Sequence, residues 1–336
     1  AVFGPTKAGA KIESSKSWAK EIMIQANAPT AKSQTFTDGV AATEYIHQIG
    51  APIVVKADGL AAGKGVIVAT TVEEAIAAVS ELLGNNSGKL VIEEFLTGSE
   101  VSVLAVTDGQ TIRPLSPAQD HKRIGEGDTG KNTGGMGAYA PVPLVTAELM
   151  TRIEQEILQP TLAALNQKGI DYRGVLYAGL MITPTGEPKV IEFNCRFGDP
   201  ETQVVLPLLN TPLDEVLLAC VEQRLEQLPP LEWKRGSAVC VVAASGGYPD
   251  AYAKGKAIAG ISEANQTGAI VFHAGTKLQQ DQLITDGGRV LGITAVGDDF
   301  QQARAIAYDA LELVQFEGMY YRRDIGYKYG QDEYFR

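Results

Sequence analysis

The sequence predicts an α+β fold of two or three domains, and three observations support this prediction. Segments with helical spacing are interspersed with short strand-like runs, and no internal repeat is present. A length of 336 residues exceeds the usual size of a single hydrophobic core. A hydrophobic fraction of 45% and a charged fraction of 21% are typical of globular proteins.

The first predicted element is an amphipathic helix over residues 11–26. Ile12, Trp18 and Ile22 fall on one helical face, which is the pattern of a helix packed against a core. Lys16 lies off this apolar stripe.

A small unit of two strands and a helix is predicted next. Residues 52–56 and 66–69 have the composition of two strands, and the glycine-rich loop between them suggests a hairpin. Thr71 with Glu74 three residues later forms a capping box, which predicts a helix that ends near Gly84.

A larger mixed sheet is predicted further along the chain. Its expected strands lie at residues 90–96, 101–106, 111–115, 174–181 and 189–193. Thr146 can cap a long helix that precedes the last two of them. The run Leu228-Pro229-Pro230 is the expected linker to a last domain, whose strands begin at Ser237.

Charge and cysteine content exclude several classes of protein. A net charge of −11 argues against nucleic acid or an anionic membrane as the main partner, since either favours a basic patch. Three widely spaced cysteines fit neither a disulfide framework nor paired zinc ligands. We therefore expect a cytoplasmic protein, and the sequence shows no membrane-spanning apolar stretch or secretory signal.

The loop from Lys56 to Val66 has the chemistry of a phosphate-binding segment. Its glycines allow backbone amides to approach oxyanions, and its lysines supply positive charge. The spacing is not that of a Walker motif, because Gly65 stands where a Ser or Thr should be. The alternative is a flexible hairpin with a solvated lysine, but packing alone poorly explains Lys56 at the end of an apolar strand.

Two further segments offer nucleotide and metal ligands. Residues 93–96 and Glu100 suit an adenine edge and ribose hydroxyls, although an edge strand with solvated glutamates is an alternative. Glu192 and Asn194 lie two apart on a strand and therefore share a face, which suits Mg²⁺. Arg196 beyond them could hold a carboxylate or a phosphoryl group, and the alternative is a surface strand with an ion pair.

A glycine-rich polar loop over residues 120–137 is the fourth candidate segment. Its hydroxyls, charges and glycines suit the binding of a small polar ligand, although composition alone equally allows a disordered surface loop. His121 could act as a base, but a structural histidine is more common. Cys195 is interpreted as a small buried residue rather than a nucleophile.

Together these motifs resemble those of the ATP-grasp ligases, and among them the glycinamide ribonucleotide synthetase family of purine biosynthesis. The resemblance covers essentially the whole chain. Its most specific signatures lie at residues 56–66, 119–139 and 192–203. Shorter matches occur at residues 4–5, 15–16, 273–276, 287–291 and 323–326.

The resemblance implies the ATP-grasp fold, in which two α+β subdomains hold ATP between them, followed by a small C-terminal mixed β/α domain. It assigns residues 1–34 and 97–230 to the large subdomain, 35–96 to a smaller lid and 231–336 to the C-terminal domain. The family also has an N-terminal dinucleotide-fold domain, and this sequence is expected to start after it.

The resemblance also implies which residues form the site. ATP is expected to contact Lys16, Lys56, Gly63, Lys64, Gly65, Glu93, Glu94, Phe95, Leu96 and Glu100. A Mg²⁺ or Mn²⁺ ion is expected on Glu192 and Asn194. Catalytic roles are expected for Arg196, Lys56 and Asp120. The other substrates are expected to contact Asp120, Lys122, Gly134, Gly135, Met136, Arg196, Arg289 and Arg323.

The family reaction joins glycine to 5-phosphoribosylamine and converts ATP to ADP and phosphate through a glycyl phosphate intermediate. The implied partners are these small molecules, bound by a monomer. One departure is that Gly179-Leu180-Met181 carries no second metal carboxylate, which many ATP-grasp enzymes have. Two alternatives stay open: an ATP-binding fragment without full activity, and a purine-pathway carboxylase that activates bicarbonate. The loop from Asp120 to Met136 argues against the carboxylase.

Overall fold

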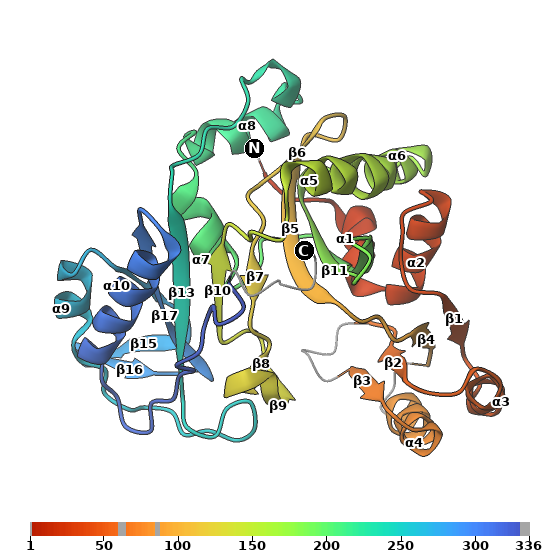
Figure 1. The fold of residues 1–336 in the computed structure, drawn as a ribbon, viewed down its shortest axis with the longest axis horizontal. Helices are drawn as coiled ribbons and strands as arrows, with labels where there is room; N and C mark the ends of the chain where they lie inside the picture. Colours follow the sequence, from red (N-terminus) through yellow and green to blue (C-terminus); the bar gives the residue numbers. More distant parts are fainter. Residues whose placement is uncertain (1, 60–64, 85–87, 330–336) are drawn as a thin grey trace.

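The computed structural model describes residues 2–59, 65–84 and 88–329, which form three larger β-sheets with helices packed on their faces (Figure 1). Two ribbons of two strands each accompany these sheets. Neighbouring strands within the sheets pair in antiparallel fashion, which together with the helices confirms the predicted α+β class. No helix among these residues is both long and apolar enough to cross a membrane.

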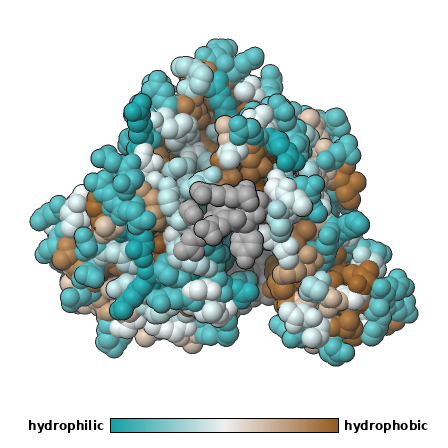
Figure 2. Space-filling model, in the orientation of Figure 1, coloured by the Kyte–Doolittle hydropathy of each residue, from teal (hydrophilic) through white to brown (hydrophobic). Residues whose placement is uncertain are grey.

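A four-stranded sheet with two helices forms the lobe at the lower right of Figure 1, which also projects from the surface in Figure 2. The strands pair in the order β1 (Ser33–Phe36), β4 (Leu90–Glu94), β2 (Ile53–Ala57) and β3 (Val66–Ala69). Ile53, Val55 and Ile92 point to one face, where they pack with helices α3 (Gly39–Ile49) and α4 (Val72–Leu82). We call this lobe the small lobe.

The predicted hairpin and helix start in the small lobe are confirmed. Lys56 pairs with Val66 across β2 and β3. The Oγ1 atom of Thr71 accepts a hydrogen bond from the Glu74 amide at 3.2 Å and caps α4. The Glu74 carboxylate instead accepts hydrogen bonds from the amide and hydroxyl of Thr70, at 2.8 and 2.7 Å, so the capping box is shifted by one residue.

The prediction of one helix over residues 11–26 is wrong, because the chain forms two helices, α1 (Lys7–Ser14) and α2 (Lys16–Gln25). Ser15 between them has an extended backbone, with φ −139° and ψ 106°, and its hydroxyl caps α2 at the Trp18 amide. The Asp58 carboxylate also accepts a hydrogen bond from the Ser17 amide at 3.1 Å. This contact from a distant strand end stabilises the break, and helical periodicity does not show it.

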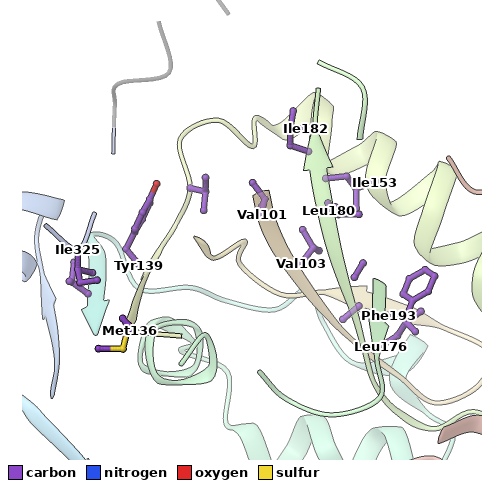
Figure 3. Close-up of a cluster of buried hydrophobic side chains, with 14 of the residues drawn as sticks. Val101, Val103, Met136, Tyr139, Ile153, Leu176, Leu180, Ile182, Phe193 and Ile325 are labelled. Atoms are coloured by element: carbon purple, nitrogen blue, oxygen red, sulfur yellow. The ribbon is translucent and has the colours of Figure 1, made fainter. Parts of the chain in front are cut away.

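The central sheet joins β12 (Pro188–Asn194), β11 (Gly174–Ile182), β5 (Ser99–Thr107) and β6 (Ile112–Pro114) in that order. One face packs against helices α1 and α2 and against a continuous helical segment of α5 (Ala147–Ile153), a π-turn (Glu154–Leu158) and α6 (Gln159–Gln167). Figure 3 shows Val103 and Leu180 from the strands beside Ile153 of α5. As predicted, Thr146 caps this segment, accepting a hydrogen bond from Leu149.

The opposite face of the central sheet changes from apolar to polar along its length. At one end Leu104, Val106 and Val175 pack with helices α7 (Thr202–Val205) and α8 (Leu213–Val221). At the other end the same alternation presents Ser102, Tyr177 and Glu192. This polar end forms the floor of the candidate site.

A five-stranded sheet occupies the other side of the molecule. Its order is β14 (Ile270–His273), β17 (Arg289–Gly297), β13 (Ser237–Ala244), β10 (Gly137–Ala140) and β7 (Gln119–Asp120). Val239 and Val241 of β13 share a core with α10 (Phe300–Leu313), whereas Ala238 and Cys240 pack with α7 on the other face. The remaining elements are α9 (Ile261–Gln266), β8 (Arg123–Gly125), β9 (Thr129–Asn132), β15 (Thr276–Gln279) and β16 (Gln282–Thr285).

This sheet draws strands from both sides of the expected domain boundary near residue 231. Strand β10 pairs with β13 along its whole length, with Tyr139 opposite Val239. Within residues 119–140, β7 and β10 belong to this sheet and β8 and β9 pair as a hairpin between them, which differs from the alternative of a disordered loop. The domain limits given above stay a prediction.

Candidate functional site

Lys56 belongs to a buried cluster of charges where the small lobe meets the central sheet. Its ammonium lies 2.9 Å from the Glu93 carboxylate and donates a hydrogen bond to the Ile191 carbonyl at 3.2 Å. Lys20 of α2 lies 3.3 Å from the other oxygen of Glu93. The three charged side chains are about 5% exposed, so the alternative of a solvated Lys56 is wrong.

Lys16 and Asp58 tie the start of the glycine-rich loop to helix α2. The Lys16 ammonium donates to the Gly59 carbonyl at 2.7 Å, and Asp58 accepts from the Ser17 hydroxyl at 2.6 Å. Burial lowers the pKa of Lys16, and the neighbouring positive charge of Lys56 lowers it further, while Glu192 opposes the shift. Lys16, Lys56 and Glu192 therefore share one electrostatic environment.

The expected adenine segment splits into one buried residue and exposed ones. Glu93 lies on a strand in the interior of the sheet and is 4% exposed, so the interpretation of an edge strand with solvated glutamates is wrong for it. Glu94 is exposed and accepts from the Lys32 amide at 3.2 Å, and exposed Phe95 follows the end of β4. Leu96 is half-buried beyond it. The roles of these residues stay predictions.

Glu192 and Asn194 lie on the polar end of the central sheet, as their spacing predicts. Tyr177 pairs with Asn194 and Gly179 with Glu192, and a bulge at Gly179 shifts the register beyond them. A side-chain carbon on Gly179 would lie 3.4 Å from the Glu192 side chain. The strand next to Glu192 thus offers no carboxylate at this position, in agreement with the departure seen in the sequence.

The chemistry of this pair fits a small divalent cation. A carboxylate and an amide oxygen are hard ligands, and Mg²⁺ in nucleotide sites takes one or two such groups together with phosphate oxygens. Within the described part of the chain, no group of three or more acidic, histidine or cysteine side chains is arranged to hold a metal. Glu192 and Asn194 supply two oxygen ligands, and water or phosphate oxygens would complete the coordination of a cation there.

Asp120 and Lys122 lie beside Glu100 near the same floor. The Lys122 ammonium is 2.6 Å from the Glu100 carboxylate, and both are partly exposed. Withdrawal from water raises the pKa of Asp120 to about 7; Lys122 lowers it, while Glu201 and Glu100 add to the rise. An aspartate with this pKa can exchange a proton near neutral pH.

Glu201 is a buried partner of this group that sequence analysis missed. One of its oxygens accepts from the hydroxyls of Tyr177 at 2.5 Å and Ser102 at 3.1 Å. Burial raises the pKa of Tyr177 well above its ordinary value, and the charges of Glu201 and Asp120 add to the rise. The Tyr177 hydroxyl is thus kept protonated, as a hydrogen-bond donor, beneath Asn194.

Arg196 follows strand β12 and is held by a residue of α1. Its Nε atom donates to the Glu13 carboxylate at 3.0 Å, and one terminal nitrogen reaches the Asn194 amide oxygen at 3.5 Å. The side chain is 58% exposed. Arg196 therefore stands beside the candidate metal ligands, as predicted, with part of its guanidinium open to a ligand.

Gly134 and Gly135 are enclosed by residues of the five-stranded sheet and of the turn after β12. Arg289 donates to the Gly134 carbonyl at 2.7 Å and the Asp199 carbonyl at 2.8 Å. A side-chain carbon on Gly134 would come within 2.8 Å of the Arg289 guanidinium, and one on Gly135 within 2.5 Å of Pro200. Gly135 requires glycine, because its φ is 111° and it packs against the Pro200 ring, whereas a side chain on Gly134 would displace the Arg289 guanidinium. Buried Met136 follows them.

The Arg289 side chain thus contacts the glycine-rich segment, whereas the Arg323 side chain lies elsewhere. Arg323 is exposed and lines a shallow depression with α10 residues, including Arg304 and Tyr308. Its neighbour Arg322 is fully buried and pairs with Asp128 and Asp324. The expected substrate contact of Arg323 is therefore not brought together with the other site residues in this structure, and it stays untested.

His121 is a structural residue in this arrangement. Its Nε2 atom accepts a hydrogen bond from the Gly326 amide at 2.9 Å, and the ring is 1% exposed. Burial lowers its pKa, so the ring is neutral, with the Nδ1 proton directed towards Asp128 at 3.7 Å. The interpretation of His121 as a base finds no support in this geometry.

Several site residues were given no role by the sequence patterns, and others lie outside the described residues. Lys20 and Glu13 lie outside the motifs, Glu201 lies within the signature at residues 192–203 without an assigned role, and their burial and partners reveal all three. Gly63 and Lys64 of the expected phosphate loop lie outside the described residues. Gly65 is buried, and its carbonyl accepts a hydrogen bond from the Ala57 amide at 2.8 Å.

Two family models match the chain and together span most of it. Residues 14–202 match the ATP-grasp (A) domain of phosphoribosylglycinamide synthetase. Residues 238–328 match the C domain of the same family. The first match contains the small lobe, the central sheet and the candidate metal ligands.

Curated relatives carry one name. Phosphoribosylamine–glycine ligase of Nostoc is 64% identical over 332 residues, which cover 97% of this chain and 78% of the relative. The Synechocystis protein of that name is 62% identical over 327 residues, with the same coverage. The ligase of Vibrio vulnificus is 47% identical over 97% of this chain and 77% of its own length.

Solved structures both inside and outside this family share the fold of this chain. The biotin carboxylase domain of 2-oxoglutarate carboxylase from Hydrogenobacter thermophilus was solved with MgADP and bicarbonate. It has a TM-score of 0.71 at 17% identity, over 95% of this chain and 69% of that one, and shows the fold alone. Thermotoga maritima phosphoribosylamine–glycine ligase has a TM-score of 0.89 at 40% identity, over 96% of this chain and 81% of that one. This chain has the ATP-grasp fold and belongs to the phosphoribosylglycinamide synthetase family, which includes these phosphoribosylamine–glycine ligases.

Proposed function

We propose that this chain is the ATP-dependent ligase that joins glycine to 5-phosphoribosylamine, using the residues at the polar end of the central sheet. The observation that carries the proposal is the grouping there of Glu192, Asn194 and Arg196 with the two lysines of the nucleotide side. Ligase activity in purine biosynthesis follows from family membership. The assignment of individual residues is our inference from geometry.

Lys16 and Lys56 are suited to hold the phosphates of ATP. The Lys56 ammonium has two contacts among the described residues and Lys16 has one, so each keeps N–H donors for a ligand. Lys20 and Lys56 share the single carboxylate of Glu93 in a poorly solvated place, which favours a further anion beside Lys56. The small lobe that carries Lys56 would then cover the nucleotide.

Glu192 and Asn194 would hold the Mg²⁺ that accompanies the nucleotide. Such an ion neutralises charge on the phosphate oxygens and orients the transferred group. Mn²⁺ can bind to the same hard oxygen ligands. The position of Arg196 beside Asn194 places a fixed positive charge next to this pair, where a guanidinium can bind a carboxylate or phosphoryl oxygens.

The proposed chemistry needs positioning and charge rather than a protein nucleophile. A glycine carboxylate oxygen attacks the γ-phosphorus of ATP, ADP leaves, and glycyl phosphate forms. The amine of phosphoribosylamine then attacks the glycyl carbonyl carbon, and phosphate leaves with the transferred oxygen. The amine loses a proton in this step, and Asp120 is the group whose pKa suits it as the acceptor.

The decisive assay follows ADP release by the full-length protein under three substrate conditions. We expect release that requires both glycine and 5-phosphoribosylamine, with glycinamide ribonucleotide as the product. Release with bicarbonate and another purine-pathway amine, and none with glycine, would instead support the carboxylase alternative. ATP binding without release under any condition would support a binding fragment. An intact mass of the assayed protein ensures that the result refers to its complete length.

A further inference from the structure

Glu13 of α1 makes a set of contacts that the proposed reaction does not yet explain. Its carboxylate accepts hydrogen bonds from Arg196 Nε and from the Cys195 amide, both at 3.0 Å, and from the Cys195 thiol at 3.1 Å. The side chain is 15% exposed. The Glu13 carboxylate therefore contacts both Cys195 and Arg196, the two residues that follow the candidate metal ligands.

These contacts fix which part of Arg196 is available to a ligand. A guanidinium has five N–H donors. Nε donates to Glu13, and the terminal nitrogens donate one hydrogen each to Phe197 and Asn194. Two donors on the terminal nitrogens then remain, which matches the two oxygens of a carboxylate in a bidentate pair.

The same carboxylate also fixes the backbone that carries the guanidinium. The second oxygen of Glu13 accepts from the Cys195 amide and thiol. Because Arg196 is 58% exposed, packing alone does not hold it, and these contacts set its orientation.

We propose that Glu13 is a positioning residue that orients Arg196 so that its two free donors receive the carboxylate of glycine. This inference rests on the proposed function, since it assumes that the protein activates glycine. Glu13 itself does not contact the substrate. It acts by holding Nε, so that one terminal nitrogen faces Asn194 and the other faces the Phe197 carbonyl.

The test compares the full-length wild type with the variant Glu13→Gln. Glutamine keeps the size but has one acceptor oxygen, so it cannot satisfy both Arg196 and Cys195. We expect kcat/KM for glycine to fall roughly tenfold or more, because a misaligned binding group weakens attack. The dissociation constant of a non-hydrolysable ATP analogue should stay within about twofold, since Lys16 and Lys56 are unchanged.

A double-mutant cycle separates positioning from general structural damage. If Glu13 acts through Arg196, Glu13→Gln should cause no further loss of kcat/KM for glycine in an Arg196→Ala background. The control Glu156→Gln removes a comparable helix carboxylate, which lies 2.8 Å from Arg152 Nε far from the site residues, and it should leave kinetics unchanged. Glu13→Asp keeps the charge with shorter reach and should be intermediate.

Three outcomes overturn the proposal while leaving the ligase assignment intact. These are an unchanged kcat/KM for glycine in Glu13→Gln, an additive loss in the double variant, and a parallel loss of ATP-analogue affinity. If Glu13→Gln does not fold, as judged by thermal unfolding, the same comparisons are made with Glu13→Asp. Failure of the proposed function is recognised separately, because the wild type itself would then show no glycine-dependent ADP release.

Discussion

Two buried ion clusters in this protein differ in how completely their donors are used. In the first, Arg322 donates through four hydrogen bonds to Asp128, Asp324 and the Arg123 carbonyl. In the second, Glu93 is shared by Lys20 and Lys56. We call these the arginine cluster and the lysine cluster.

The difference separates a structural role from a ligand-binding one. In the arginine cluster Arg322 pairs with two carboxylates, Lys328 is a second cation on Asp128, and the cluster ties the segment after α10 to the β8–β9 hairpin. In the lysine cluster the three donors of Lys20 are engaged by Glu93, Thr30 and Ala31, whereas those of Lys56 are not all engaged by described residues. The remaining donors of a buried ammonium need acceptors, and phosphate oxygens are the acceptors that we propose for Lys56.

The largest effect is expected from removing the carboxylate of Glu192, which lies next to the lysine cluster. Glu192→Ala should reduce Mg²⁺-dependent turnover more than about a hundredfold, because the ion's contribution amounts to several kcal/mol. The thermal unfolding midpoint should change little, since Glu192 is only half-buried. The control Glu187→Ala alters an exposed carboxylate on the turn before β12 and should leave turnover unchanged. Unaltered turnover in Glu192→Ala would reject its metal role.

The second prediction breaks the arginine cluster. Arg322→Met leaves Asp128 and Asp324 without their main partner and should lower the free energy of unfolding by about 3 kcal/mol. This is the low end of the usual range, because both carboxylates keep some contact with water. Denaturant titration measures the change. A loss of ATP-analogue affinity without loss of stability would show that the two clusters have been assigned the wrong roles.

The third prediction separates the two lysines that share Glu93. Lys56→Met should weaken binding of an ATP analogue roughly tenfold to a hundredfold, the value of a charge-assisted hydrogen bond. Lys20→Met should mainly lower stability, since its donors are engaged within the protein. Calorimetric titration and denaturant unfolding of both variants give the comparison. Equal effects of the two substitutions on nucleotide affinity would contradict it.

The smallest expected effect is a pH dependence of stability that arises from His121, whose ring faces Asp128 of the arginine cluster. Burial lowers the pKa of His121 from its ordinary value of 6.5, so the unfolded chain takes up a proton that the folded ring does not. Stability should therefore be lost as pH falls below 6.5, by at most about 1.4 kcal/mol per pH unit from this group. In His121→Gln this part of the slope should disappear in unfolding titrations at pH 7.5 and 5.5. A slope that persists unchanged would assign the effect to other groups.

The sequence predicts those parts of the fold that depend on local spacing. Strand β3 lies at the expected residues, and the Thr71 cap and the β2–β3 hairpin form as predicted. The break at Ser15 was missed because Asp58, distant along the chain, stabilises it. The pairing of β10 with β13 is likewise non-local, and no periodicity within either strand indicates it.

The same distinction applies to the site. Glu192 and Asn194 were predicted because strand alternation places them on one face. Glu13 and Lys20 could not be predicted in this way, because their roles arise from partners just after β12 and on β4 that only the tertiary fold brings near. Arg323 shows the converse, since a motif match led to a residue that lies apart from the site residues, while its neighbour Arg322 forms the buried cluster.

The most direct test of the central claim follows one oxygen atom from glycine. The protein is supplied with ATP, 5-phosphoribosylamine and glycine labelled with ¹⁸O in its carboxylate, and the inorganic phosphate is analysed by mass spectrometry. Because a carboxylate oxygen attacks the γ-phosphorus and leaves with it, we predict one ¹⁸O atom in each phosphate released. Phosphate without ¹⁸O, formed together with glycinamide ribonucleotide, would contradict activation of glycine at this site.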